Sequence, residues 1–161
     1  MPAATAGNHG NEPTFLGSVK WVRAIQAGLI VGAILFVIGR ANPWTASGII
    51  NPTIMGRELP PSEMATPGNF FGFLTGHLLL AMLYGLIIAP IVHGLRPFVA
   101  GMAGALVGLI LYFLNFAAYA LFFEASLRPT EWVPVIVHIV FGIITAEAYK
   151  GLAKRRVIAA A

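Results

Sequence analysis

Cysteine is absent from the 161 residues, and charged residues are scarce, at 10% of the chain. Without a thiol the protein forms no disulfide, no thiolate nucleophile and no cysteine-ligated zinc or iron–sulfur centre. Thiol-based, quinone-linked redox enzymes of membranes are excluded for the same reason. A soluble domain carries about 25% charged residues, so this chain has too few charges to cover a water-facing surface.

Apolar residues make up 58% of the chain, and the mean hydropathy is +0.82. The stretch 70–95 reads FFGFLTGHLLLAMLYGLIIAPIVHGL and contains no Asp, Glu, Lys or Arg. Its length of about 25 residues is enough to cross a ~30 Å hydrocarbon core as a helix. The sequence therefore predicts an all-α integral membrane protein, a four-helix bundle. The expected spans are about 21–39, 69–93, 98–123 and 131–152.

The segments outside the spans are short, so we expect one membrane domain and no separate soluble domain. Residues 1–18 are rich in Ala, Gly, Asn, Thr and Pro, which predicts a disordered N-terminal tail. Residues 19–153 form the expected four-helix transmembrane domain, and residues 154–161 a basic C-terminal tail. The 41–68 connection contains five prolines and an apolar piece too short to span, which we expect at the membrane interface or across the mouth of the bundle.

Lysine and arginine are unevenly distributed between the two sides of the predicted bundle. Four spans place both termini on one side, and seven of the ten Lys and Arg residues fall there. Because cytoplasmic loops carry the excess of positive charge, we expect both termini in the cytoplasm and a multi-pass protein of a bacterial inner membrane. The seven are Lys20, Arg23, Arg96, Lys150, Lys154, Arg155 and Arg156, against Arg40, Arg57 and Arg128 on the other side.

The two halves of the chain resemble each other. AGLIVGAIL at 27–35 matches AGALVGLIL at 103–111, and YGLIIA at 84–89 matches FGIITA at 141–146. Gly, Leu, Ile and Ala dominate all membrane helices, so chance is the competing explanation. The same order of matches recurs in both spans, which favours two tandem two-helix repeats with the same orientation.

Small and polar residues also follow a definite order along the chain. The first span carries Gly-xxx-Gly, and the second opens with Gly-xxx-Gly-His followed by Tyr-Gly. The third is rich in glycine, and the fourth carries His-xxx-Gly. Over about residues 28–152 this order resembles the YagU-like and related families of small bacterial inner-membrane proteins. The resemblance implies a four-helix architecture and supplies no activity. The matching positions are Gly72, Gly76, His77, Tyr84, Gly85, Gly104, Gly108, His138 and Gly142.

Ionisable and polar groups inside a bilayer are costly, so they are the first candidates for a functional site. His77 and His138 lie at similar depths in two spans that run in the same direction. A span that runs the opposite way brings further polar residues to the same level. We expect a polar cluster near the outer mouth of the bundle, made of His77, His138, Asn115, Tyr119, Arg40 and Glu124.

Three interpretations of this cluster remain open. In the first, the histidines hydrogen-bond to Asn115, Tyr119 or backbone carbonyls and hold the helices together. In the second, His77 and His138 ligate a haem b, because two imidazoles at matched depth suit bis-histidine ligation. In the third, the cluster is the outer vestibule of a transport or permeation path. A zinc site is a poor match because only two good ligands converge.

Glu147 is the one acidic residue well inside a span, and it lies near the predicted cytoplasmic end. We expect its carboxylate to reach the interface and pair with Lys150, three residues later. The alternative is an inner gate or proton site in which Glu147 pairs with Gln26. His93 lies at the inner boundary beside Arg96, where we expect it to be solvated.

Glycine pairs at a four-residue spacing let helix backbones approach closely in lipid. Gly28 with Gly32, and Gly104 with Gly108, are expected either to pack the halves within one subunit or to form a dimer face. Because the two pairs match in the internal duplication, packing within the subunit is favoured.

No nucleotide-binding loop, catalytic triad or metalloprotease motif is present in the sequence, and its few basic residues do not suggest nucleic-acid binding. We therefore expect a non-enzymatic scaffold or accessory subunit, or a small transporter or channel component, without a cofactor. Its expected partners are the lipid bilayer, further copies of itself or other membrane subunits. The alternative is a haem b subunit for electron transfer.

Overall fold

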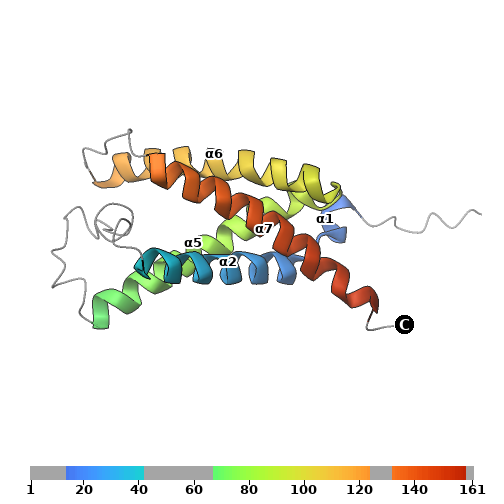
Figure 1. Cartoon of the computed structure of the whole chain (residues 1–161), viewed down its shortest axis with the longest axis horizontal. Coiled ribbons are helices and arrows are strands. Elements are labelled where there is room, and N and C mark those ends of the chain that lie inside the picture. The colour runs from blue at the N-terminus through green and yellow to red at the C-terminus, as the bar shows by residue number, and fades with distance from the viewer. Residues whose placement is uncertain (1–13, 42–66, 124–131, 159–161) are drawn as a thin grey trace, which may run out of the picture.

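The computed structural model describes residues 14–41, 67–123 and 132–158, and every regular element in these ranges is an α-helix. Four long helices are apolar enough to cross a membrane, and one single-turn helix precedes them (Figure 1). The prediction of an all-α protein with four potential membrane spans is therefore confirmed. The helices are α1 (Phe15–Ser18), α2 (Trp21–Ala41), α5 (Pro67–Val92), α6 (Pro97–Phe123) and α7 (Trp132–Ile158).

Seven of the eight predicted boundaries of the long helices lie within two residues of the observed ones. The exception is the end of α7, which continues to Ile158 and so includes part of the expected basic tail. The single turn of α1 falls inside the expected disordered tail, where the Thr14 hydroxyl accepts from the Gly17 amide at 3.3 Å. The connections 42–66 and 124–131 lie outside the described residues.

The tight connection from α5 to α6 follows from its prolines. Pro90 falls in the last turn of α5, where the helix ends two residues later at Val92. Pro97 is the first residue of α6. Proline is well tolerated there, because an amide N–H at this position makes no hydrogen bond within the helix. Only residues 93–96 separate the two helices, so α5 and α6 run in opposite directions.

The four long helices associate as two sequential pairs, α2 with α5 and α6 with α7. Glycine sets the approach of the helices in each pair. A Cβ at Gly85 would lie 3.0 Å from the Cα of Gly28, and a Cβ at Gly142 would lie 3.1 Å from the Cα of Gly108. Each added Cβ would also collide with a backbone carbonyl oxygen of the facing helix, that of Ala24 or Gly104 respectively.

The four glycines expected from the sequence to pack helices all lie at these contacts. Gly28 and Gly32 face α5 at Ala81, while Gly104 and Gly108 face α7. Each glycine pair therefore packs two helices of the same half, rather than one half against the other. Without side chains at these positions the backbones come close enough for extensive van der Waals contact, which drives helix association in lipid.

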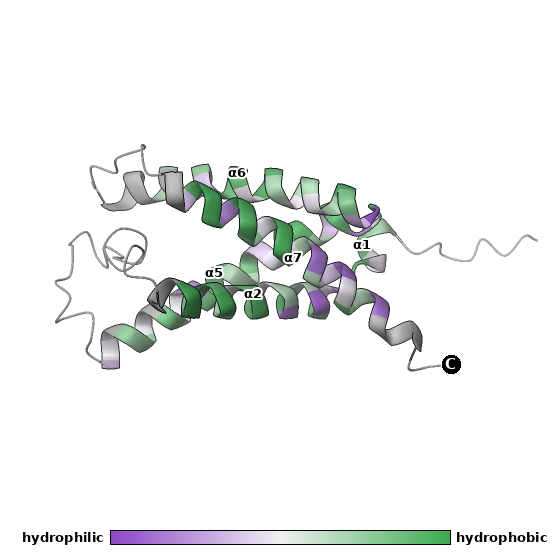
Figure 2. Ribbon diagram, viewed as in Figure 1, coloured by the Kyte–Doolittle hydropathy of each residue, from purple (hydrophilic) through white to green (hydrophobic). Residues whose placement is uncertain are grey.

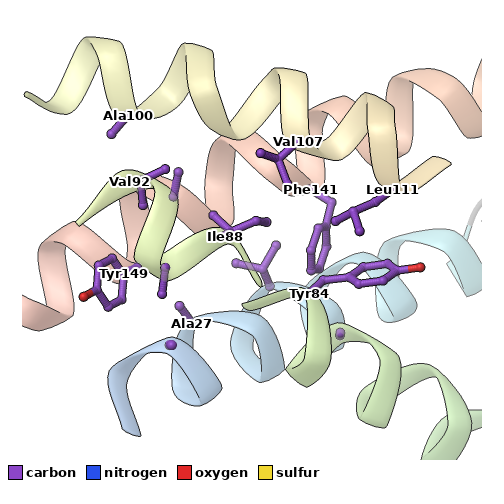
Figure 3. Close-up of a cluster of buried hydrophobic side chains, with 14 of the residues drawn as sticks. Ala27, Tyr84, Ile88, Val92, Ala100, Val107, Leu111, Phe141 and Tyr149 are labelled. Atoms are coloured by element: carbon purple, nitrogen blue, oxygen red, sulfur yellow. The ribbon is translucent and has the colours of Figure 1, made fainter. Parts of the chain in front are cut away.

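The two pairs meet through α7, which also packs against α2 and α5 (Figure 1). The buried side chains there form one cluster that includes Ala27, Ile88 and Tyr149 (Figure 3). The rings of Tyr84 and Phe141, from the two different pairs, meet edge to face at 6.0 Å. This cluster is the core that holds the pairs together.

The long helices consist mainly of hydrophobic residues (Figure 2), and many of their large apolar side chains are exposed. Only 24–33% of each candidate span is buried, and large side chains such as Val22, Phe98 and Leu106 are more than half exposed. A water-soluble protein rarely exposes apolar surface on this scale, whereas lipid covers it without cost. The arrangement is that of a multi-pass membrane protein.

The start of α2, the α5–α6 turn and the last turns of α7 lie at one end of the bundle, on the right in Figure 1. We call this end the basic end, because Lys20, Arg96, Lys150 and Lys154 lie there. Hydrophilic residues gather at the same end in Figure 2.

Replacing Gly142 by alanine should loosen the contact between α6 and α7. The new methyl group would clash with the Gly104 backbone, and we expect a loss of about 1–3 kcal/mol in stability. The measurement is the thermal unfolding midpoint of the purified protein in detergent. Gly76→Ala is the matched control, because a Cβ at Gly76 meets nothing within 4 Å. Equal midpoints for the two variants would contradict the role of the glycine contact.

Candidate functional site

A chain of hydrogen bonds links α5, α6 and α7 within the apolar part of the bundle. The Tyr84 hydroxyl donates to the Asn115 amide oxygen. The Asn115 amide nitrogen donates to His138 Nε2 at 3.0 Å. His138 Nδ1, 2.8 Å from the Pro134 carbonyl oxygen, then carries the ring proton and donates it there. The donors and acceptors alternate along the chain, and this order fits a neutral His138.

His77 belongs to the other helix pair. Its Nε2 donates to the Gly32 carbonyl oxygen of α2 at 3.0 Å. The ring lies against Phe36 with a centroid distance of 5.5 Å, and His138 lies against Tyr112 at the same distance. Each histidine therefore packs on an aromatic side chain of the partner helix in its own pair.

This geometry tests the haem interpretation of the two histidines. An iron ligand needs the lone pair of a ring nitrogen, and a haem needs two such nitrogens facing across a slot. His77 Nε2 donates its proton to Gly32, and His138 Nε2 accepts from Asn115. Bis-histidine ligation through the two Nε2 atoms would therefore require both of these hydrogen bonds to break.

The structure brings together only part of the polar cluster expected from the sequence. Asn115 and His138 are in direct contact, whereas His77 bonds to the backbone of α2. Arg40 and Tyr119 lie on α2 and α6, but their side chains are outside the described part of the structure, as is the whole of Glu124.

Sequence reasoning missed Tyr84 as a member of the polar cluster. It follows His77 by seven residues, which is two helical turns, so the two side chains share a face of α5. This spacing from a histidine inside a predicted span could have identified Tyr84 as a member of the polar cluster.

Thr145 is fully buried in the core, at 0% exposure, and is the one buried polar residue of the described ranges. Its hydroxyl has no hydrogen-bond partner among the described residues. Burying a hydrogen-bond donor without a partner is unfavourable, so this hydroxyl lowers the stability of the fold.

A second group of hydrogen bonds ties three segments together at the basic end. The Tyr149 hydroxyl accepts from the Lys20 amide at 3.2 Å and donates to His93 Nδ1 at 2.6 Å. The Lys150 ammonium donates to the carbonyl oxygens of His93, at 3.1 Å, and of Leu95. Lys150 thereby satisfies carbonyl groups left free where α5 ends.

His93 is thus hydrogen-bonded and half-buried, in contrast to the solvated side chain expected from the sequence. Burial lowers the pKa of His93, and the positive charges of Lys150 and Lys20 lower it further. The ring also meets Phe15 edge to face at 6.4 Å. A neutral imidazole is the form that accepts from the Tyr149 hydroxyl.

Glu147 takes neither of its two expected partners. The Lys150 ammonium is directed to backbone carbonyls, and the Gln26 amide oxygen accepts from Arg23 at 2.6 Å. The exposed Glu147 carboxylate lies beside Gly101, where a Cβ would come within 3.2 Å of its oxygen. The small residue on α6 leaves room for the carboxylate against that helix.

Comparison with known proteins found no match. No family model matches the chain, and no curated protein or solved structure matches it. The membrane-embedded polar groups must therefore be interpreted from their own chemistry. Within the described residues, no group of three or more His, Asp or Glu side chains could hold a metal ion.

Replacing Asn115 by leucine should destabilise the fold, because it removes the partner of both Tyr84 and His138. Hydrogen bonds between membrane helices contribute about 0.6–2 kcal/mol each, so we expect a loss of about 1–3 kcal/mol. Thr145→Val is the matched control, because it removes a hydroxyl without a described partner, and should leave stability equal or up to about 1 kcal/mol higher. Thermal unfolding in detergent measures both, and a more harmful Thr145→Val would contradict this assignment.

Stability should fall in acid through His93. Because the folded-state pKa is lowered, the unfolded chain binds a proton below its ordinary pKa of about 6.5 while the folded protein does not. The contribution of His93 to the free energy of unfolding is therefore fully present above about pH 6.5 and declines as the pH falls below that value. We expect the unfolding midpoint of the wild type to drop more between pH 7 and pH 5 than that of His93→Gln. Parallel pH profiles would show that His93 makes no such contribution.

Proposed function

We propose that this protein is a non-enzymatic membrane subunit that acts as a scaffold or accessory component. The observation that carries the proposal is the chain from Tyr84 through Asn115 to His138, in which the polar groups bond to one another. A transport or reaction site directs its polar groups toward a substrate, whereas here they join three helices. His77 likewise bonds to the neighbouring helix.

We infer that the protein lies in a bacterial inner membrane with both termini in the cytoplasm. The positive-inside rule supports this orientation, since the expected topology assigns seven of the ten Lys and Arg residues to the side of the termini. The order of Gly, His and Tyr residues resembles that of the YagU-like and related families, whose members are small inner-membrane proteins. That resemblance supports the architecture and adds no activity.

We also infer that the chain consists of two tandem helix-pair repeats. In both pairs the helices cross through glycines of the matching stretches, which supports the inference. Gly85 meets Gly28 in one pair, whereas Gly142 meets Gly104 and Gly108 in the other. Phe36 and Tyr112 correspond in the match, and each lies against a histidine of the next long helix, although His77 aligns with Pro134 and not with His138.

Transport is the second candidate, and two side chains favour it. The Thr145 hydroxyl is buried without a described partner, and the Glu147 carboxylate lies near the basic end on the same helix. Four helices enclose little space, so a conducting path would need a homo-oligomer. The paired state of Asn115 and His138 favours the scaffold over this alternative.

A flux measurement separates the two candidates. Purified protein in proteoliposomes should pass H⁺, Na⁺, K⁺ and Cl⁻ no faster than empty liposomes do, because its polar groups are bonded to each other. A flux that is lost in Asn115→Leu or Glu147→Gln would overturn the scaffold proposal in favour of transport. Gly76→Ala, in open space, is the control for nonspecific effects of substitution.

The same preparation decides the haem alternative. Protein purified from haem-replete cells should show no Soret band, because both histidine Nε2 atoms are hydrogen-bonded. A Soret band that disappears in His77→Ala or His138→Ala would establish ligation and overturn the assignment of a purely structural role to the two rings.

A further inference from the structure

The basic end collects positive charge from three separate segments. Lys20 directly precedes α2, Arg96 ends the α5–α6 turn, and Lys154 lies one turn beyond Lys150 on α7. The Tyr149 hydroxyl accepts from the Lys20 amide, and the Lys150 ammonium donates to the carbonyl of Leu95, the residue before Arg96. These bonds hold the backbones of the three segments against one another.

Little negative charge opposes these cations. Within the described residues the only carboxylate side chain is Glu147, which lies against Gly101 of α6. Lys20, Arg96 and Lys154 are exposed, whereas the ammonium of Lys150 is directed to backbone carbonyls. Three cationic side chains are therefore presented to the surroundings at one end of the bundle, where hydrophilic residues gather in Figure 2.

Exposed apolar side chains lie next to the same cations in the chain. Phe98 follows Arg96 by two residues and is 80% exposed, and Phe15 and Leu16 of α1 are 60% and 56% exposed. Phe15 packs against the His93 ring, which places α1 beside the α5–α6 turn. An adjoining cationic and apolar surface matches a molecule with a charged head and a hydrocarbon body.

We propose that the basic end binds the phosphate headgroup of an anionic phospholipid through Lys20, Arg96 and Lys154. The apolar side chains of Phe15, Leu16 and Phe98 would lie along the upper part of its acyl chains. Tyr149 and Lys150 act as positioning residues, because they fix the three segments that carry the cations. The inference does not depend on whether the protein is a scaffold or a transporter.

The test is equilibrium binding of phosphatidylglycerol and phosphatidylcholine to the full chain in nonionic detergent, followed by native mass spectrometry. The wild type should bind phosphatidylglycerol more tightly than phosphatidylcholine. The variant Lys20→Gln/Arg96→Gln/Lys154→Gln should lose at least about tenfold in affinity for phosphatidylglycerol, since each cation contributes about fivefold near an anionic headgroup. Its phosphatidylcholine binding should be unchanged.

Two controls keep the test specific. Arg40→Gln removes one cation at the opposite end of the bundle and should leave phosphatidylglycerol binding unaltered. The charge-preserving variant Lys20→Arg/Arg96→Lys/Lys154→Arg should retain most of the affinity, which separates a loss of charge from a loss of fold.

Three results would overturn the proposal. Equal affinities of the wild type for the two lipids would show that headgroup charge is not recognised. An unaltered triple glutamine variant would show that these residues do not form the site. Displacement of phosphatidylglycerol by inorganic phosphate alone would assign the site to a free anion in place of a lipid.

Discussion

Close approach of helix backbones is the constraint on which the rest of this structure depends. Lipid tails are as apolar as leucine side chains, so burying apolar surface supplies little attraction between helices in a membrane. Gly28, Gly85, Gly104 and Gly142 compensate by removing side chains where α2 crosses α5 and α6 crosses α7. The resulting contact fixes two rigid pairs. The positions of the histidines, of Asn115 and of the basic residues all follow from how these pairs dock.

Hydrogen bonds between polar side chains restrict how the two helix pairs can be placed against each other. In a bilayer an unpaired polar group has no water to bond with, so Asn115 gains from both of its partners. Tyr84 comes from one pair and His138 from the other, so the Asn115 amide links the two pairs in the membrane-embedded region. Apolar contacts such as that between Tyr84 and Phe141 tolerate sliding, whereas this bonded chain has one register.

The sequence was sufficient to predict the spans, because long apolar runs bounded by proline and charge leave few alternatives in lipid. It also identified Asn115 and His138 as neighbours, through equal depth on adjacent helices. It included backbone carbonyls among the possible partners of His77 but did not specify that of Gly32, because backbone acceptors carry no sequence signal. The Glu147–Lys150 pair was expected from spacing on one helix, but the carbonyls at the end of α5 compete for the same ammonium.

Each tightly packed pair is made of helices that follow one another in the chain, and this has a consequence for biogenesis. The glycine contact between α2 and α5 uses no residue of α6 or α7, so these two helices can pair before the later helices are synthesised. The bonds of Tyr149 and Lys150 reach back to Lys20 and to the α5–α6 turn. These bonds can form only after α7 has been inserted. They then join the last helix to the start of the first long helix and to the α5–α6 turn.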